Sequence, residues 1–199
     1  MPDTASDLTA LIGSRICHDL ISPIGAIGNG VELLTMSGLN AAPEVALISE
    51  SVQSASARIR FFRIAFGSAP DDQHVGHAEI LSILQAMTAS GKKTVTWDAE
   101  GPVARSDARL LFLIILCIET AMPWGGRLTV SRAGEGWTVA GRAEALKLDP
   151  ELWQMIEDGV CAREVTSAEV HFPLAMQAAQ QAGRHLKVVT NPVRITVSF

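Results

Sequence analysis

The stretch RICHDLISPIGAIGNGVELL, residues 15–34, belongs to a segment in which apolar residues recur at intervals of three and four. Between Asp7 and Leu34 the only internal stop signal is Pro23, and this spacing is typical of one long amphipathic helix. The apolar stripe comprises Ile12, Ile16, Leu20, Ile24, Ile27, Val31 and Leu34. The sequence therefore predicts a helix over residues 7–34 that packs through this stripe.

A second helix is predicted directly after it. The intervening residues TMSGLNAAP (35–43) indicate a helix end, a short turn and a proline in the first turn of the next helix. The apolar residues that follow alternate spacings of three and four without a break, as in a coiled-coil seam. They are Val45, Ile48, Val52, Ala55, Ile59, Phe62 and Phe66. We expect the two helices to form a hairpin.

Both helices also carry apolar residues off their main stripes, namely Leu11, Ile21 and Leu33 on the first and Leu47 and Phe61 on the second. A second copy of the hairpin would bury them, so we predict a homodimer built around a four-helix bundle with two-fold symmetry. Packing against the rest of the same chain is the alternative explanation.

The segment GSAPDDQ (67–73) has the composition of a linker and predicts two domains, residues 1–69 and 70–199. The pattern of the second domain predicts helices interleaved with mostly antiparallel strands, and therefore an α+β fold with an α/β sandwich. The expected helices are 77–89, 107–122, 150–157 and 168–182, and the expected strands are 93–99, 127–133, 136–143, 185–190 and 193–199.

Composition narrows the functional classes. A net charge of -5 argues against non-specific nucleic-acid binding, and the longest apolar run, Leu110–Ile118, is too short to cross a membrane. The acidic start MPDTASDL is unlike a signal peptide, so we expect a cytoplasmic protein. Three scattered cysteines suggest neither a disulfide framework nor a zinc site.

His18 is the only histidine in the first seventy residues. On a helix it lies about 200° from both Ile16 and Leu20, so it points away from the packing stripe toward solvent. The adjacent Asp19 can fix the imidazole tautomer and leave the other ring nitrogen free as a nucleophile. Pro23 removes a helical hydrogen bond and predicts a bend one turn below the histidine. The other residues on this face are Ser14, Arg15, Ile21, Ser22, Gly25 and Asn29, which are mostly small or polar.

The motif HDLISPI (18–24) resembles the phosphoacceptor box of dimeric histidine kinases, in which a histidine, an acidic residue, a leucine and a proline recur at the same offsets. The resemblance implies that His18 is a phosphoacceptor in a dimerisation domain. It also implies that residues 70–199 form a sandwich like the ATPase domain of those kinases.

The elements that bind ATP in those kinases are missing here. The helix LLFLIILCIETAMP (110–123) has Glu119 near the place of a magnesium-binding asparagine, and VAGRAEALKLDP (139–150) contains no D-x-G-x-G. GVCAREVTSAEV (159–170) has no glycine cluster. A triphosphate would therefore lack charge compensation, and we expect no ATP-dependent kinase activity and no cofactor bound by this chain.

Over nearly its whole length the chain resembles the ChpT-type histidine phosphotransferases of bacterial phosphorelays, with the likeness carried by residues 15–34 and by AMQAAQQAGRHLKV (175–188). The family implies that His18 takes a phosphoryl group from one receiver domain and passes it to another. It suggests a hybrid histidine kinase upstream and a CtrA-type response regulator downstream, with Mg²⁺ held by the receiver domain.

The partner's docking surface can be placed by counting residues. With the turn centred near residue 39, His18 is level with Arg60, and Arg58, Phe61 and Arg63 surround that point. The arginines could offset the charge of phosphohistidine or meet an acidic receiver surface, and solvated charges beside a seam are the alternative explanation. Around the histidine the further docking candidates are Arg15, Ile21, Ser22 and Gly25.

Three alternatives stay open at this point: a histidine autokinase that uses ATP, a hydrolase that pairs Cys17 with His18, and a dimeric adaptor without catalysis. Adjacent helix residues point about 100° apart, which disfavours the Cys17–His18 dyad.

Overall fold

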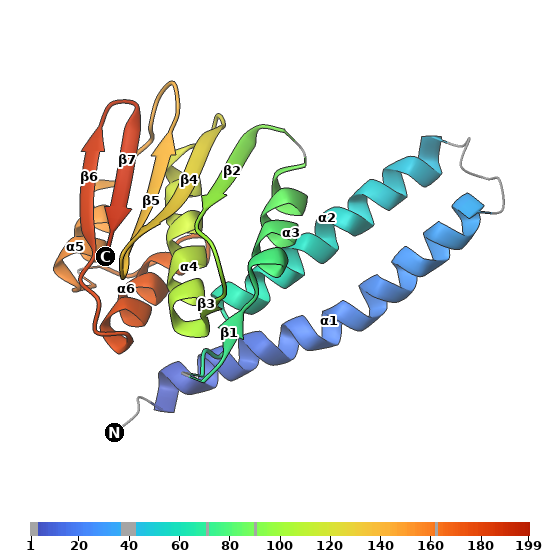
Figure 1. Ribbon diagram of the computed structural model, residues 1–199, viewed down its shortest axis with the longest axis horizontal. Helices are drawn as coiled ribbons and strands as arrows, with labels where there is room; N and C mark the ends of the chain where they lie inside the picture. The colour runs from blue at the N-terminus through green and yellow to red at the C-terminus, as the bar shows by residue number, and fades with distance from the viewer. Residues whose placement is uncertain (1–3, 37–42, 71, 90, 162) are drawn as a thin grey trace. The chain divides into compact units, whose positions relative to one another are not determined.

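The computed structural model describes residues 4–36, 43–70, 72–89, 91–161 and 163–199 (Figure 1). The chain divides into two compact units, residues 1–68 with 82–89 and residues 69–81 with 90–199. Helix α3 (His77–Thr88) contributes its second half to the first unit. The predicted α+β class is confirmed.

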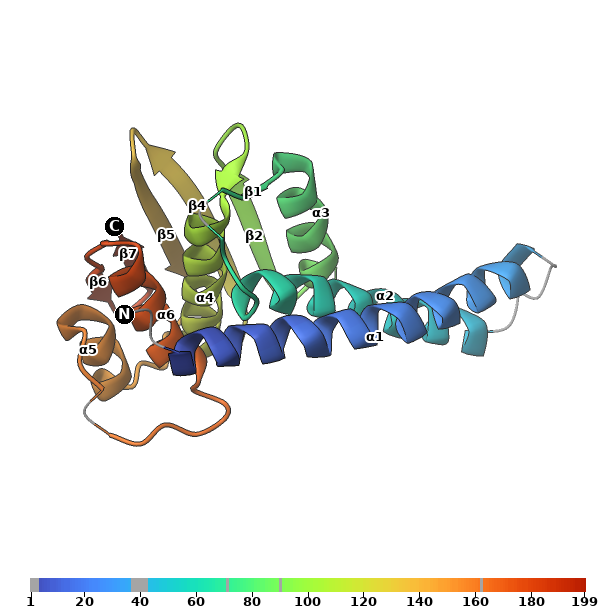
Figure 2. The same ribbon diagram turned by 90° about the horizontal axis from the view of Figure 1, so that it is seen from below.

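The first unit is built on a hairpin of two long helices, α1 (Thr4–Met36) and α2 (Pro43–Ala65), which lie side by side in Figures 1 and 2. Both predicted helices are confirmed, and α2 begins at Pro43, whose fixed φ suits a first helical turn. Helix α1 continues through Pro23. The predicted turn falls in residues 37–42, which lie outside the described residues.

Small residues on α1 bring the two helices together. A Cβ atom on Gly13 would lie 2.8 Å from the carbonyl oxygen of Phe66, and one on Gly28 would lie 3.4 Å from Val52 Cγ1. Cys17 and Val31, on the same side of α1, are 6% and 7% exposed. The seam therefore follows the small residues of α1, because they let α2 approach closely.

The apolar stripe predicted for α1 is mostly not the face that packs against α2. Five of its seven members are about half exposed, with exposed fractions between 45% and 54%; they are Ile12, Ile16, Leu20, Ile27 and Leu34. The spacing of three and four identified a real apolar face, but the centre of that face is rotated around the helix, by about the angle between successive residues, from the face that meets α2. Within one chain most of the stripe is left uncovered.

The second unit has a five-stranded sheet in the order β2-β4-β5-β7-β6, in which β2 runs parallel to β4 and the other pairs are antiparallel. Helices α4, α5 and α6 lie on one face of it (Figure 2). The elements of this unit are β1 (His74–Val75), β2 (Lys93–Asp98), β3 (Val103–Ala104), α4 (Arg105–Ala121), β4 (Gly126–Ala133), β5 (Gly136–Arg142), α5 (Pro150–Asp158), α6 (His171–Gln181), β6 (Lys187–Asn191) and β7 (Arg194–Ser198).

The core of this unit lies between α4 and the sheet. Residues 110–115 of α4 are all at most 1% exposed, which explains why this helix is apolar all round. At Gly141 of β5 an added Cβ would collide with Ile118 of α4, so this glycine lets the helix lie close to the sheet. No helix in the described ranges is long and apolar enough to cross a bilayer.

Two features of the second unit differ from the sequence prediction. The pair β1 and β3 was not predicted, because strands of two residues are too short to show a periodicity. Helix α6 begins at His171 instead of residue 168. The Glu169 carboxylate accepts hydrogen bonds from the backbone N–H and the hydroxyl of Thr166, at 2.9 and 3.0 Å, which favours a separate turn before the helix.

His171 gives this unit a testable pH dependence. Its ring is 8% exposed and its Nε2 lies 3.0 Å from Thr120 Oγ1, and burial lowers its pKa to about 4 although nearby Glu169 opposes the shift. The unfolded chain takes up this proton at about pH 6.5, so stability falls as pH drops from 6.5 toward 4, by on the order of 2 kcal/mol. We expect urea unfolding between pH 7 and 5 to show this slope in the wild type and a flatter one in His171→Gln. Equal slopes would contradict the assignment.

Candidate functional site

The candidate site is the exposed side of α1 around His18, whose side chain is 82% exposed. His18 Nδ1 lies 3.1 Å from Asp19 Oδ1, and Arg15 Nε donates a 2.8 Å hydrogen bond to Asp19 Oδ2. The structure therefore confirms that His18 points to solvent and that Asp19 contacts it. Arg15 was predicted as a docking residue, but here it holds Asp19, a role that its spacing of four residues could have indicated.

The electrostatics of this cluster fix the tautomer of His18. The hydrogen bond with His18, and then the one from Arg15, hold the pKa of Asp19 below its usual value. An ionised carboxylate can only accept, so Nδ1 of a neutral His18 ring carries the proton that it donates to Asp19. The lone pair is then on Nε2, on the side of the ring away from Asp19, and Nε2 is the nucleophilic atom.

The arginines of α2 lie close to where counting placed them. The contacts of Gly13 with Phe66 and of Gly28 with Val52 put His18 level with residues 61–62, one or two positions beyond Arg60. Arg60 is partly buried and its Nη1 lies 3.4 Å from Ser82 Oγ of α3. Arg58 and Arg63 are exposed. The sequence could not show that α3 would engage Arg60.

Phe61 was predicted as a docking residue and this prediction is wrong. Its side chain is 1% exposed, so it belongs to the core and cannot meet a partner on this surface. The prediction failed because Phe61 lies off the seam of α2, and an off-seam aromatic is equally consistent with a core position covered by another part of the chain. Only the tertiary structure distinguishes the two.

Below His18 the surface of the hairpin is open. Ile21 and Ser22 are exposed, and a Cβ atom on Gly25 would have no neighbour within 4 Å. Gly25 also lines a hollow of about 650 Å³ in the first unit, together with Gly28, Asn29, Glu32, Gln53 and Arg60. This part of the face can accept a protruding element of a partner.

Cys17 does not form a catalytic pair with His18. Its thiol is buried on the α2 side of the helix, and burial raises its pKa despite the nearby Arg63 charge. A protonated thiol is a poor nucleophile. The hydrolase alternative therefore loses its nucleophile.

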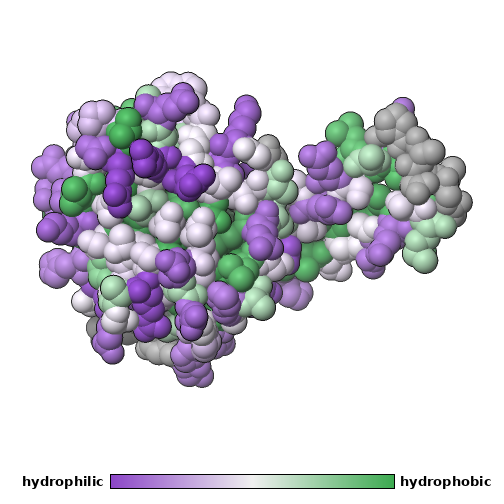
Figure 3. Space-filling model, turned by 45° about the horizontal axis from the view of Figure 1, so that its top comes forward, coloured by the Kyte–Doolittle hydropathy of each residue, from purple (hydrophilic) through white to green (hydrophobic). Residues whose placement is uncertain are grey.

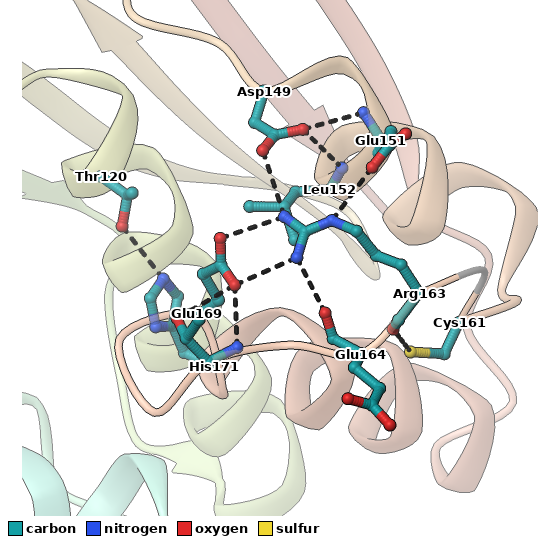
Figure 4. Close-up of polar contacts among 10 residues, drawn as sticks. Thr120, Asp149, Glu151, Leu152, Cys161, Arg163, Glu164, Glu169 and His171 are labelled. Carbon is teal, nitrogen blue, oxygen red and sulfur yellow. Dashed lines mark hydrogen bonds and ion pairs between the residues drawn. The ribbon is translucent and has the colours of Figure 1, made fainter.

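In the segment in which the sequence lacks a glycine cluster, of which residues 159–161 and 163–170 are described, one arginine makes most of the polar contacts (Figure 4). The Arg163 guanidinium forms ion pairs with Asp149 and Glu151 at the start of α5, both at 3.1 Å, and with Glu169 at 3.0 Å. The hydrogen bond from Arg163 is the main cause that lowers the pKa of Glu169 to about 2. All three carboxylates are therefore ion-pair partners of Arg163.

Comparison with known proteins identifies the family of this chain. The family model described as the histidine phosphotransferase C-terminal domain matches residues 77–193. The protein phosphotransferase ChpT of Brucella abortus (strain 2308) is 30% identical over 191 residues, which cover 93% of this chain and 91% of that protein. The chain belongs to the histidine phosphotransferase family.

One solved structure shows the same likeness. A bacterial phosphotransferase solved at 1.7 Å matches this histidine phosphotransferase with a TM-score of 0.70 and 25% identity, covering 100% of this chain and 97% of that one. A histidine kinase domain from Erythrobacter litoralis aligns with a TM-score of 0.45 and 15% identity over 92% of each chain. The family and the phosphotransfer function predicted from the sequence are thus confirmed.

Proposed function

We propose that this histidine phosphotransferase relays a phosphoryl group between receiver-domain aspartates of two other proteins through Nε2 of His18. The Nε2 lone pair forms the bond to phosphorus as the bond from phosphorus to the donor carboxylate oxygen breaks. The donor aspartate leaves as a carboxylate. In the second half of the relay, an acceptor carboxylate attacks the phosphohistidine and restores the neutral ring. The observation that carries this proposal is the exposed His18 ring with Nδ1 held by Asp19.

The chemistry is divided between this chain and its partner. The receiver domain supplies Mg²⁺, which neutralises the charge on the transferring phosphoryl group. This chain supplies an oriented nucleophile and a rigid docking face made of Arg15, Ile21, Ser22, Gly25, Arg58 and Arg63 around the histidine, with Arg60 beside it. Pro23 is assigned to shape α1 below the histidine. We place the relay in the cytoplasm, with a hybrid kinase as donor and a CtrA-type regulator as acceptor.

The uncovered stripe of α1 supports a homodimer. Ile12, Ile16 and Ile27 lie on one side of the helix, at about 100° or more from His18, and each is about half exposed. Further apolar side chains, Leu33, Leu34, Met36, Leu47 and Ile48, are exposed toward the end of the hairpin, where Figure 3 shows apolar surface on the right. Two copies that pack these surfaces would form a four-helix bundle and leave both histidines free.

Substitution of Asp19 by asparagine tests its role as the positioning residue. The amide can donate to Nδ1, which favours the tautomer with the proton on Nε2 and removes the nucleophilic lone pair. We expect transfer from a phosphorylated receiver domain to slow by about 10- to 100-fold, with unchanged receiver affinity. Single-turnover label transfer separates rate from affinity. A rate equal to that of the wild type would remove Asp19 from the mechanism, and Arg15→Gln should have a smaller effect.

Gly25 tests the docking face. Because nothing lies within 4 Å of a Cβ built there, both alanine and leucine fit the free protein, and both should stabilise the helix by about 0.5–1 kcal/mol. Gly25→Leu should weaken receiver binding at least about tenfold while Gly25→Ala has little effect. Titration of receiver domain into each variant measures this. Equal affinities for both variants would place the partner elsewhere.

A further inference from the structure

One face of the sheet carries a row of arginines. In the ladder, Arg127 of β4 pairs with Arg142 of β5, which in turn pairs with Arg194 of β7. All three are exposed and alternate along their strands with the buried residues Leu128, Gly141 and Ile195. They therefore stand side by side on the face opposite α4, at the strand spacing of about 4.8 Å. Like charges directly opposite one another destabilise a sheet.

Within the described part of the chain, no carboxylate forms an ion pair with this row. Two partly buried arginines of the unit do have acidic partners, Arg163 with three carboxylates and Arg184 with Asp107. Side chains of the row form no ion pair or hydrogen bond with any described residue. A hollow of about 590 Å³ at this end of the sheet is lined by Lys92, Thr94, Arg127, Arg142 and Glu144, among others.

The rest of the open face carries mostly small side chains, many of them with hydroxyl groups, together with one exposed valine and two charged residues. The next rows are Thr96, Thr129, Ala140, Thr196 and Val189, then Asp98, Ser131, Thr138, Ser198 and Lys187. Both large aromatic residues of these strands, Trp97 and Trp137, are buried on the other face. The surface thus offers guanidinium groups and hydroxyls over three rows, and lacks aromatic groups on which bases could stack.

We propose that this face binds an acidic segment of a partner polypeptide, whose carboxylates pair with Arg127, Arg142 and Arg194. Guanidinium groups bind carboxylates in bidentate fashion, and the hydroxyl rows can hydrogen-bond a peptide backbone. An extended chain crossing the strands can reach all three arginines, whereas a single small anion can bridge two at most. The absence of stacking groups and the net charge of -5 disfavour a nucleic acid. The site is independent of His18.

The test uses the full chain and a fluorescein-labelled deca-glutamate peptide, with binding followed by fluorescence anisotropy at about 150 mM salt. We expect the wild type and His18→Ala to bind equally, and Arg142→Glu to bind at least about tenfold more weakly. Lys147→Glu, which makes the same change in net charge at an exposed site outside the row, should bind within about twofold of the wild type. No binding by the wild type, or equal loss in both variants, would overturn the proposal.

Two further measurements make the outcome specific. Arg142→Glu places a carboxylate between two arginines, so its midpoint of thermal unfolding should rise by about 1 to 3 °C, which also shows that it folds. A fall in the midpoint would contradict the repulsion in the row.

Competition with a deca-thymidine oligonucleotide or with inorganic phosphate at equal charge should displace little peptide. Displacement by the oligonucleotide would assign the face to nucleic acid, and displacement by phosphate to a small anion, and either would overturn the peptide proposal.

Discussion

His18→Ala is expected to abolish labelling of the protein by a phosphorylated receiver domain. The substitution removes the only atom proposed to bond phosphorus, so transfer in both directions should fall to background instead of slowing by a finite factor. The measurement is transfer of ³²P from the receiver, with the label on the wild type being acid-labile and stable in alkali. Because the ring is 82% exposed, the variant should keep the wild-type midpoint of thermal unfolding.

His185→Ala is the matched control, since His185 is also exposed and lies in the second unit. It should be labelled at the wild-type rate. Acid-labile label that persists on His18→Ala would refute the role of His18. The same assay with ATP and Mg²⁺ in place of the receiver tests the autokinase alternative, which predicts labelling that depends on His18. Full signalling with His18 replaced would favour the adaptor alternative.

Ile16→Glu combined with Ile27→Glu is expected to convert the protein into monomers. Both side chains are about half exposed in one chain, 54% and 50%, and two-fold symmetry brings four of them into the proposed interface. Full burial of such a side chain contributes about 1.5–3 kcal/mol, and the dimer completes the burial of four half-exposed ones. Replacing all four should therefore raise the dimer dissociation constant by about a thousandfold. Sedimentation equilibrium over a range of concentrations measures this constant.

Leu11→Glu is the control for the dimer. Leu11 is 57% exposed, and its substitution makes the same change from an apolar to a charged side chain. Leu11 lies on the face of His18, however, about 140° around the helix from Ile16. It should leave the dimer intact and the helix content unchanged. Apolar character alone groups Leu11 with the residues that a second hairpin would bury, but its angle to Ile16 separates it from them. A double variant that stays dimeric would move the interface to another surface.

Local patterns allowed much of this protein to be predicted. Apolar spacing, Pro43 and the polar turn residues determined the hairpin, and the helical angle alone made His18 exposed. The order of helices and strands in the second unit also followed, because each is long enough to show its period. The exceptions were the two-residue strands β1 and β3 and the turn that Glu169 holds before α6.

Contacts between distant residues were decided only by the tertiary structure. Periodicity marks an apolar face but not its partner, so the sequence could not show that α2 packs on Gly13, Cys17 and Gly28 while the isoleucine stripe stays uncovered. The contact of Arg60 with Ser82 depends on an element further along the chain, and the burial of Phe61 is visible only in the folded chain.

The arginine row is the clearest case, since residues 127, 142 and 194 become neighbours only through strand register. The sequence by itself determined that His18 is exposed on a helix, because side-chain direction on a helix is a local property. Which surfaces are free to meet partners is a property of the folded chain, because it depends on what the rest of the chain covers.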